Sequence, residues 1–439
     1  MDFKPIQKLN VTRTLSTGES AHVGVLAQNH QGVFFQYESD YLNQFANLSP
    51  FLMEETTVLQ SAPSEPHMGL HGLFADSLPD GWGLLLQDRV FRQHNILPSQ
   101  ITAMDRLAFI GSGGMGALSF DPVYEYKKTT TETFDLEMLG LEAQAIFDGQ
   151  TQEVLGALVA AGSSGGARPK AQLFFSSDSS DQCRTKQCRT KQCRTEPQEG
   201  DEAWLVKFTS QNLQLGHEEG LCEAVYLQLA EMAGLQPPEW QLLKAPDKSG
   251  ADYWLALKRF DWTNNTSTNK PGRLHMHSAC GLLDADFRTP SLDYVDLIKA
   301  SRQLCKSPAV GQLQFCRAIF NLFACNQDDH SKNWAFLQED NGQWQVAPFY
   351  DVTFSPHPFN QHATAYDGFG RQPPLKTIQK LATHAGFSNW KQAKQQIQKI
   401  VEVISNFTNI AEEYGIHKKT ITLMRQELDK RRQENAELF

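Results

Sequence analysis

The chain has 439 residues, of which 40% are hydrophobic and 21% are charged, a balance typical of a globular protein with two or three domains. Its net charge of −10 at pH 7 excludes a protein built mainly to bind polyanions, although a local basic patch is compatible with it. No apolar stretch is long enough to span a membrane, and the start MDFKPIQKLN lacks the apolar region of a signal peptide. We therefore expect a cytoplasmic protein that makes no membrane contact.

The eight cysteines form no C-x-x-C pair. Three of them, Cys183, Cys188 and Cys193, belong to one short repeat, and the others lie mostly in apolar, helix-like contexts. This usage predicts reduced thiols rather than a disulfide framework or a zinc site.

The amino-terminal part begins with strand-like runs at 22–27 and 33–37, and the polar residues between them predict a β-hairpin. Further on, Asp80 stands at the N-cap of a helix expected to reach about His94, and an ordinary helix start is the simplest interpretation. Residues 111–114 are rich in glycine. Turns of this kind are usually structural, so we do not assign them to a nucleotide.

A second stretch of small residues, 158–170, follows a helix expected at 134–150 and leads into an apolar strand. It is neither a Walker A loop nor G-x-G-x-x-G. Its glycines allow backbone N–H groups to approach phosphates, although a structural turn is the commoner use of such a sequence.

Residues 176–201 form an insert in which Cys-Arg-Thr-Lys-Gln is repeated and then begins a third time at Cys193. A short repeat flanked by Ser, Asp, Pro and Gly predicts a disordered loop that interrupts a hairpin. A metal- or nucleic-acid-binding arm is the alternative, but cysteines at this spacing match no zinc site. Deleting 182–195 should therefore change stability and activity little.

The strand expected at 203–208 contains Lys207 among apolar residues. A buried ammonium needs a partner unless it snorkels from an edge, and a strand lysine that contacts ATP phosphates is the functional alternative. The following helix, 217–233, offers Glu223 and, one turn earlier, Glu219 as partners. The next apolar strand ends in Arg-Phe-Asp, and a structural pair with arginine is the simplest interpretation of Asp261.

From Ser291 onward the apolar spacing is helical, at 292–298, at 313–323 and through most of 373–439. The second half of the chain should therefore form an α-helical lobe, apart from one hairpin.

That hairpin lies in the most specific stretch of the chain. Asp328 and Asn333 have the D-x-x-x-x-N spacing in which an Asp accepts a hydroxyl proton and an Asn binds Mg²⁺. Two short apolar runs then flank Asn341-Gly342, a strong hairpin signal, and the second arm carries Asp351 back beside Asn333. An acidic surface loop before an ordinary hairpin would explain the first spacing alone. The full pattern, D-x-H-x-K-N, hairpin, Y-D, is much more specific.

Residues 328–333 and 348–351 resemble the catalytic and metal-binding segments of the HipA family of bacterial toxin kinases. Further similar segments are L-P-D-G-W-G at 78–83, G-G-A-R-P-K at 165–170 and R-F-D at 259–261, so the resemblance covers nearly the whole chain. It implies an α+β, two-lobed protein-kinase-like fold with a β-rich amino-terminal part and an α-helical carboxy-terminal lobe. The domains it implies are a HipA-like β-rich domain at 1–120, a phosphate-loop and hinge part at 121–262, and a helical catalytic lobe at 263–439.

The resemblance also implies roles for single residues. Asp328 becomes the catalytic base, and Asn333 and Asp351 become ligands of Mg²⁺. Ser163 stands where the family carries a serine that can be autophosphorylated, and a phosphate there would repel those of ATP. The family commonly has Glu at the position of Lys258. The implied ATP-binding residues are Gly165, Gly166, Ala167, Arg168, Lys170, Lys207, Lys258, Phe260, His330, Lys332 and Asn333.

In function, the resemblance implies an ATP-dependent serine/threonine protein kinase, the growth-inhibiting toxin of a HipA-type toxin–antitoxin system, inactivated by its own autophosphorylation. Its partners would be a protein substrate and a small helix-turn-helix antitoxin, through which alone it would contact DNA. A kinase of a lipid or small molecule would show the same loop chemistry. A nonenzymatic co-repressor subunit of a DNA-binding antitoxin is the alternative outside the enzymes. The sequence does not name the phosphorylated target.

Overall fold

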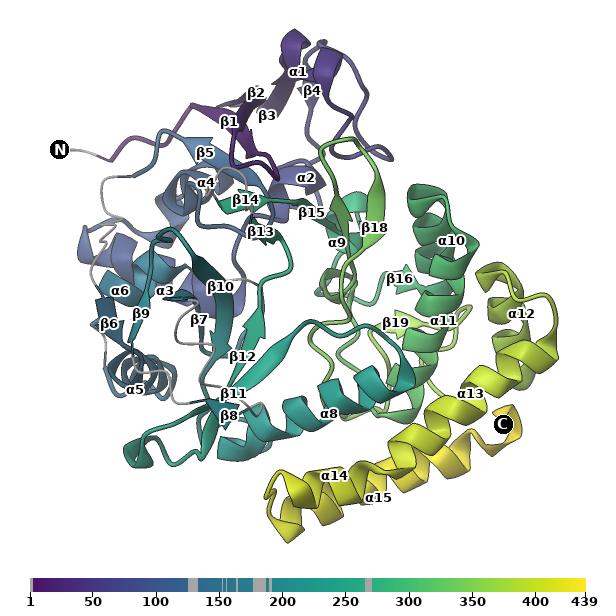
Figure 1. Cartoon of the computed structure of the whole chain (residues 1–439). Helices are drawn as coiled ribbons and strands as arrows, with labels where there is room; N and C mark the ends of the chain where they lie inside the picture. Colours follow the sequence, from purple (N-terminus) through teal and green to yellow (C-terminus); the bar gives the residue numbers. More distant parts are fainter. Residues whose placement is uncertain are drawn as a thin grey trace.

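The fold, taken from a computed structural model, has a β-rich half and a helical half (Figure 1), as predicted for an α+β, two-lobed protein. Within the described part of the chain, no helix combines the length and the apolar character needed to cross a lipid bilayer. The described residues are 3–124, 133–151, 153–154, 156–162, 165–176, 187–188, 192–264 and 271–439.

The first sheet is antiparallel and has the strand order β4-β3-β2-β1-β5. The predicted hairpin is confirmed, because β2 pairs with β3 from Gly24 opposite Tyr37 to Asn29 opposite Gly32. Alternate residues such as Leu9, Val11 and Phe35 are fully buried and pack in one cluster with α2 and α4. The elements are β1 (Lys8–Thr14), β2 (Ser20–Asn29), β3 (Gly32–Tyr37), β4 (Gln60–Ser61), β5 (Leu118–Asp121), α1 (Ser39–Gln44), α2 (Gly72–Ala75), α3 (Gly81–Gln93) and α4 (Ala103–Ile110).

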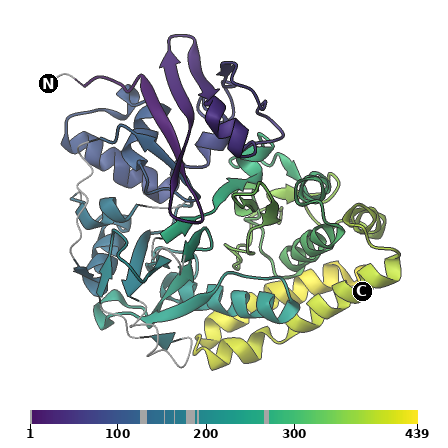
Figure 2. The same cartoon turned by 45° about the horizontal axis from the view of Figure 1, so that its top comes forward.

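The second sheet has the order β6-β9-β7-β10-β12-β11-β8, and helices cover both of its faces. In β12, Trp254 and Ala256 pack with α5 and α6, whereas Leu255 and Leu257 pack with α8, which explains the uninterrupted apolar run of this strand. Figure 2 shows α8 between this sheet and the yellow carboxy-terminal helices. The elements are β6 (Thr133–Asp135), β7 (Lys170–Ser176), β8 (Gln187–Cys188), β9 (Gln192–Arg194), β10 (Asp201–Lys207), β11 (Trp240–Lys244), β12 (Tyr253–Lys258), α5 (Leu136–Phe147), α6 (Gly156–Ala161) and α8 (Glu219–Ala233).

The prediction of a disordered insert at 176–201 is wrong for part of that range. The strand β9 pairs with both β6 and β7, and the side chain of Cys193 is buried in the core beneath the sheet. Arg194 forms an ion pair with Asp201, where β10 begins. The insert residues 177–186 and 189–191 lie outside the described residues. The interrupted hairpin is confirmed, since β7 and β10 are antiparallel neighbours.

Deleting 182–195 should consequently lower the melting temperature by several degrees, because the deletion removes a paired strand and a buried apolar side chain. Differential scanning calorimetry measures this. Cys193→Ser, which keeps the length of the chain, is the control and should cause a smaller fall. An unchanged melting temperature in the deletion variant would restore the original interpretation of a solvated loop.

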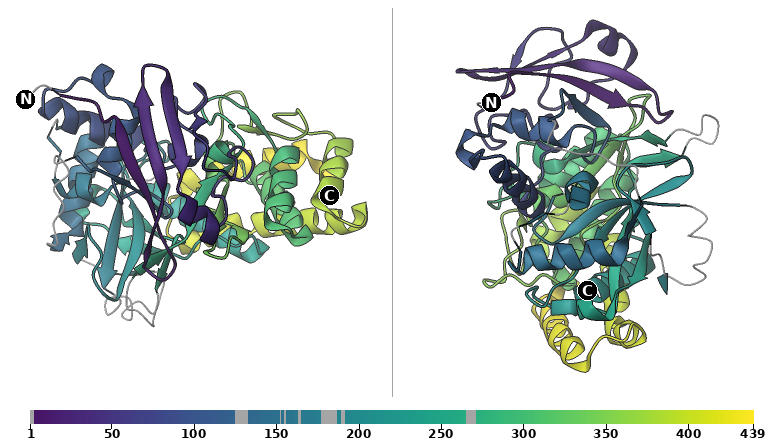
Figure 3. Two further views of the ribbon diagram at one scale, coloured as in Figure 1. Left: turned by 90° about the horizontal axis from the view of Figure 1, so that it is seen from above. Right: turned by 90° about the vertical axis from the view of Figure 1, so that its left-hand side faces the viewer.

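The carboxy-terminal half is mainly helical, as predicted, and its helices share one apolar core with α8. The two views of Figure 3 show these yellow-green helices at the end of the molecule away from the purple first sheet. This part of the chain also contains three small sheets: β13 (Trp262–Asn264) with β14 (Pro271–Arg273); β15 (His275–Ser278) with β17 (Ala335–Gln338) and β18 (Trp344–Val346); β16 (Leu292–Asp293) with β19 (Thr364–Ala365). The helices are α9 (Ala279–Leu282), α10 (Tyr294–Cys305), α11 (Pro308–Phe323), α12 (Leu375–Ala385), α13 (Trp390–Ser405), α14 (Phe407–Glu413) and α15 (Lys418–Glu434).

Two polar clusters fix the first sheet to the rest of the molecule. The buried Arg13 of β1 donates to Gln338 Oε1 at 3.2 Å and to the carbonyl of Gln338 at 3.3 Å, and it also reaches Asp340 at the tip of the β17–β18 hairpin. Asp261 is fully buried, pairs with Arg259 and accepts a 2.8 Å hydrogen bond from Gly116 N. The structural interpretation of Asp261 is therefore confirmed. Cys193, Cys222, Cys280, Cys305, Cys316 and Cys325 are free thiols.

Candidate active site

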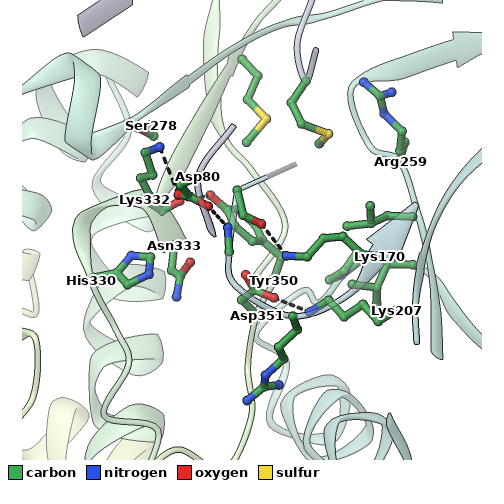
Figure 4. Close-up of a pocket in the computed structure, with 18 of the residues that line it drawn as sticks. Asp80, Lys170, Lys207, Arg259, Ser278, His330, Lys332, Asn333, Tyr350 and Asp351 are labelled. Carbon is green, nitrogen blue, oxygen red and sulfur yellow. Dashed lines mark hydrogen bonds and ion pairs between the residues drawn. The ribbon is translucent and has the colours of Figure 1, made fainter. Parts of the chain in front are cut away.

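A cavity of about 210 Å³ lies where the second sheet, the helical lobe and the segment before α3 meet. It gathers nearly every residue that the sequence analysis selected (Figure 4). Ser163 is the exception, because it falls outside the described residues. The selected residues that line the cavity are Gly165, Gly166, Ala167, Arg168, Lys170, Lys207, Lys258, Phe260, Asp328, His330, Lys332, Asn333 and Asp351.

Lys207 ends β10 inside the cavity, and its side chain is only 7% exposed. Its Nζ donates to Glu223 Oε1 at 2.7 Å and forms a second ion pair with Asp351. Burial alone would lower the pKa of Lys207, but the two carboxylates raise it above its ordinary value. The predicted partner Glu223 is thus confirmed, and the lysine is held charged at the back of the cavity.

The alternative partner, Glu219, pairs with Arg168 instead. Arg168 also lies 3.9 Å from Glu223, so the loop that begins at Gly165 is tied by charge to α8. Burial raises the pKa of Glu219 although Arg168 opposes the shift. One turn of α8 therefore supplies two carboxylates with two different cationic partners.

Lys170 is buried at the start of β7, and its Nζ donates to the carbonyl of Gly165. Burial lowers the pKa of Lys170 to about 8, and Lys207 contributes to the shift. The side chain still carries a positive charge at neutral pH, so the loop encloses a cation that can face an anionic ligand.

Asp328 and Asn333 lie at the two ends of the loop after α11. Asn333 Nδ2 donates to the carbonyl of Asp328 at 2.7 Å, a bond that closes the loop. The Asp328 side chain is 68% exposed, and His330 Nε2 lies 3.8 Å from it. The walls of the cleft raise the pKa of Asp328 by partial desolvation, which His330 opposes. A carboxylate at the rim is placed to meet a group that arrives from solvent.

The neighbouring Asp329 points in the opposite direction and is 1% exposed. It accepts hydrogen bonds from Tyr294 Oη at 2.5 Å, His362 Nδ1 at 2.9 Å and Ala363 N at 2.8 Å. No sequence pattern indicates a role for Asp329, because its partners are distant in the chain. It fixes the loop from below, so that Asp328 faces the cavity.

Asp329→Ala should destabilise the fold by about 1–3 kcal/mol, because it leaves several buried donors without an acceptor. Asp328→Ala is the matched control, since it changes the adjacent, exposed carboxylate by the same chemistry. Urea unfolding measures both. Equal stability of the two variants would show that the buried carboxylate does not hold the loop.

Asp351 follows β18 and has a left-handed φ of 51°. The preceding Tyr350 donates its hydroxyl to the carbonyl of Lys332 at 2.6 Å, which ties the two metal-candidate segments together. Burial would raise the pKa of Asp351, but Lys207 and Lys170 hold it well below its ordinary value. The carboxylate is therefore ionised over the whole neutral range.

The donor set suits one class of metal ion. Asn333 and Asp351 both line the cavity and offer hard oxygen ligands (Figure 4). Among the described residues no group of three or more His, Cys, Asp or Glu side chains forms a closed metal cage. Mg²⁺ fits such a site, because it usually takes one or two protein oxygens and completes its shell with water and phosphate oxygens.

Lys258, Phe260 and Tyr350 also line the cavity. Lys258 forms ion pairs with Glu202 at 2.6 Å and Glu239 at 3.2 Å, so its ammonium already has two protein partners. The rings of Phe260 and Tyr350 lie 5.6 Å apart and make an apolar wall. Cavity residues that the sequence analysis did not select include Asp76, Asp80, Met115, Met276 and Ser278.

Comparison with known proteins gives two family matches. Residues 162–409 match the HipA-like C-terminal domain, and residues 18–121 match the HipA N-terminal domain. A search of curated proteins finds no match.

The solved structures that match include the following two. One is from a complex described as the Shewanella oneidensis MR-1 toxin–antitoxin system HipA, HipB and its operator DNA, with 16% identity, a TM-score of 0.66 and 96% of each chain covered. The other is the Helicobacter pylori proinflammatory kinase CtkA, with 15% identity, a TM-score of 0.36, and 54% of this chain and 89% of that chain covered. The first likeness shows the fold. Because the HipA-like C-terminal domain matches more than half of the sequence, the chain belongs to the HipA family.

Proposed function

We propose that this protein is an ATP-dependent serine/threonine protein kinase and the toxin of a HipA-type toxin–antitoxin system. The observation that carries the proposal is the arrangement of one cavity, where buried lysines, an exposed carboxylate and a pair of oxygen ligands face a common space. Family membership supports the same conclusion.

In this proposal the adenine lies against the apolar wall of Phe260 and Tyr350, and the phosphates lie toward Lys207 and Lys170. Both lysines are protonated at neutral pH and line the cavity, so their charges can meet a polyanion there. A magnesium ion held by Asn333 and Asp351 would neutralise charge on the transferring phosphate. The Lys207–Asp351 pair keeps that carboxylate ionised and oriented beforehand.

Asp328 accepts the proton of the substrate hydroxyl in this mechanism. Its raised pKa makes it a better base than a free aspartate, and its position at the rim allows it to reach a side chain on another protein. Most of the rate enhancement would come from positioning and from fixed charges.

The proposal extends to partners and regulation. The similar Shewanella chain is described in a complex with HipB and operator DNA, and we propose a small helix-turn-helix antitoxin that alone contacts DNA. We also propose that slow autophosphorylation of Ser163 inactivates the kinase and so limits growth inhibition. A lipid or small-molecule kinase is the second candidate for the chemistry, although no observation on the cavity favours it.

Incubation of the purified protein with Mg-ATP, followed by mass spectrometry, tests the proposed function. The expected result is a phosphate on Ser163 and a parallel loss of activity that Ser163→Ala prevents. The peptide must be fragmented, because Ser164 is adjacent. Phosphate at distant sites only, with activity falling all the same, would refute self-inhibition. No transfer to protein, with transfer to a lipid or small molecule, would favour the second candidate.

A further inference from the structure

Asp80 precedes α3 and belongs to the amino-terminal part of the chain, yet its carboxylate lines the cavity (Figure 4). It stands at the N-cap of that helix but makes no capping hydrogen bond. An N-cap aspartate normally accepts from a backbone N–H of the first turn. Asp80 is only 6% exposed, so its carboxylate needs hydrogen-bond partners other than the first turn of α3.

One partner is the loop at residues 165–170, which leads into β7 of the second sheet and is called the glycine loop below. Asp80 Oδ1 accepts from Gly166 N, and Trp82 N donates back to the carbonyl of Gly166 at 3.1 Å. The indole of Trp82 donates to the carbonyl of Lys170 at 2.8 Å. Gly81 has a φ of 39°, and a Cβ there would lie 2.6 Å from Ala167 Cα. The segment 80–82 therefore grips the loop closely, and the Gly166 N–H is already committed to Asp80.

The other partner is the loop that carries Asp328. Lys332 Nζ lies 3.2 Å from Asp80 Oδ2 and 4.4 Å from the ring centre of Phe287. The side chains of Asp80 and Lys332 are 9% and 16% exposed, so water screens the pair only weakly. One carboxylate thus connects two loops that both line the cavity.

We propose that Asp80 is a positioning residue for phosphoryl transfer, which orients the Lys332 ammonium toward the transferring phosphate and holds the glycine loop in register with it. This inference rests on the proposed kinase function. The opposite possibility is that the Asp80 carboxylate occupies a phosphate position and hinders ATP. The two hydrogen bonds of Trp82 to the same loop favour positioning, because they act together with the Asp80 carboxylate to hold the loop.

Asp80→Asn keeps the size of the side chain and removes its charge. The expected result is a fall in kcat of at least about 10-fold with a change in the KM for ATP of less than about threefold, because Lys332 would act on the transferring phosphate more than on the bound nucleotide. Asp88→Asn is the matched control, since Asp88 lies on the same helix and pairs with Arg106 away from the cavity. It should leave kcat unchanged, and melting temperatures should show that both variants fold.

A double-mutant cycle separates positioning from a purely structural role. In a Lys332→Met background, Asp80→Asn should cause little further loss of kcat, because the lysine through which it acts is absent. If the fold-losses of kcat from Asp80→Asn and Lys332→Met multiply in the double variant, the proposal is overturned. Tighter ATP binding and faster transfer in Asp80→Asn would overturn it as well, in favour of hindrance.

Hydrogen exchange gives a readout that does not require activity. Asp80→Ala should speed exchange of the Gly166 amide, because it removes the acceptor of that N–H, while Asp88→Ala should not. If the wild-type protein transfers no phosphate at all, the proposed function fails and this measurement still decides whether Asp80 holds the loop. Unchanged exchange in Asp80→Ala would refute that hold.

Discussion

Asp328→Ala should reduce phosphoryl transfer by about 10²–10⁴-fold and leave ATP affinity within about twofold of wild type. ATP affinity should change little because the Asp328 carboxylate is 68% exposed at the rim of the cavity. Lys170 and Lys207, which would meet the phosphates, are buried. Single-turnover transfer and nucleotide titration measure the two quantities separately.

A suitable control for this variant is Asp252→Ala. Asp252 is 72% exposed and lies 3.5 Å from Lys244, so it matches Asp328 in exposure and in having a nearby cationic group, but it does not line the cavity. Its removal should leave both quantities unchanged. Wild-type transfer rates in Asp328→Ala would remove this residue from the mechanism and leave the cavity without a base.

Asp351→Asn should weaken Mg-ATP binding on the order of 10- to 100-fold. The substitution removes the charge of one of the two candidate metal ligands and also removes an ion pair of Lys207, which keeps only its 2.7 Å contact with Glu223. Calorimetric titrations with Mg-ATP, and with ATP in the presence of a chelator, test this.

The change in affinity caused by Asp351→Asn should differ in sign between Mg-ATP and metal-free ATP. ATP without metal should bind the variant at least as well as wild type, because a buried negative charge has left the phosphate side of the cavity. An unchanged affinity for Mg-ATP would contradict the metal role of Asp351. Equal losses with and without magnesium would show that the residue acts through Lys207 alone.

The parts of the fold that the sequence predicted are those set by local spacing. The β17–β18 hairpin follows from its Asn-Gly turn, and α10 and α11 follow from apolar periodicity. Asp328, Asn333 and Asp351 were selected because two fixed spacings around that hairpin bring them together. The structure gathers all three at one cavity.

What the sequence left open depends on how distant segments meet. Glu219 and Glu223 lie one turn apart on α8, so only the seating of the helix against β10 decides which of them reaches Lys207. Asp80 is not distinguishable from an ordinary N-cap until its partners, distant in the chain, are seen. Cys193 was missed for another reason: a low-complexity repeat hides one position that is apolar enough to be buried.

The contacts between the first sheet and the β17–β18 hairpin limit where the chain can be truncated. The hairpin joins the loop of Asn333 to Asp351, and its tip is held by Arg13 and by Ser16 N, which donates to Asp340 at 2.9 Å. A fragment that begins after the first sheet would keep Asp328, Asn333 and Asp351 but lose Asp80, and it would also lose the contacts that hold the hairpin between Asn333 and Asp351.

The complementary fragment, which carries the first sheet alone, would also be destabilised. Arg13 is fully buried, and this fragment lacks its acceptors on Gln338. The part of the chain that carries the first sheet and the part that carries the hairpin therefore each hold hydrogen-bond partners of the other part's polar groups. Truncation, domain exchange and fusion between relatives should therefore keep β1 and the β17–β18 hairpin from the same parent.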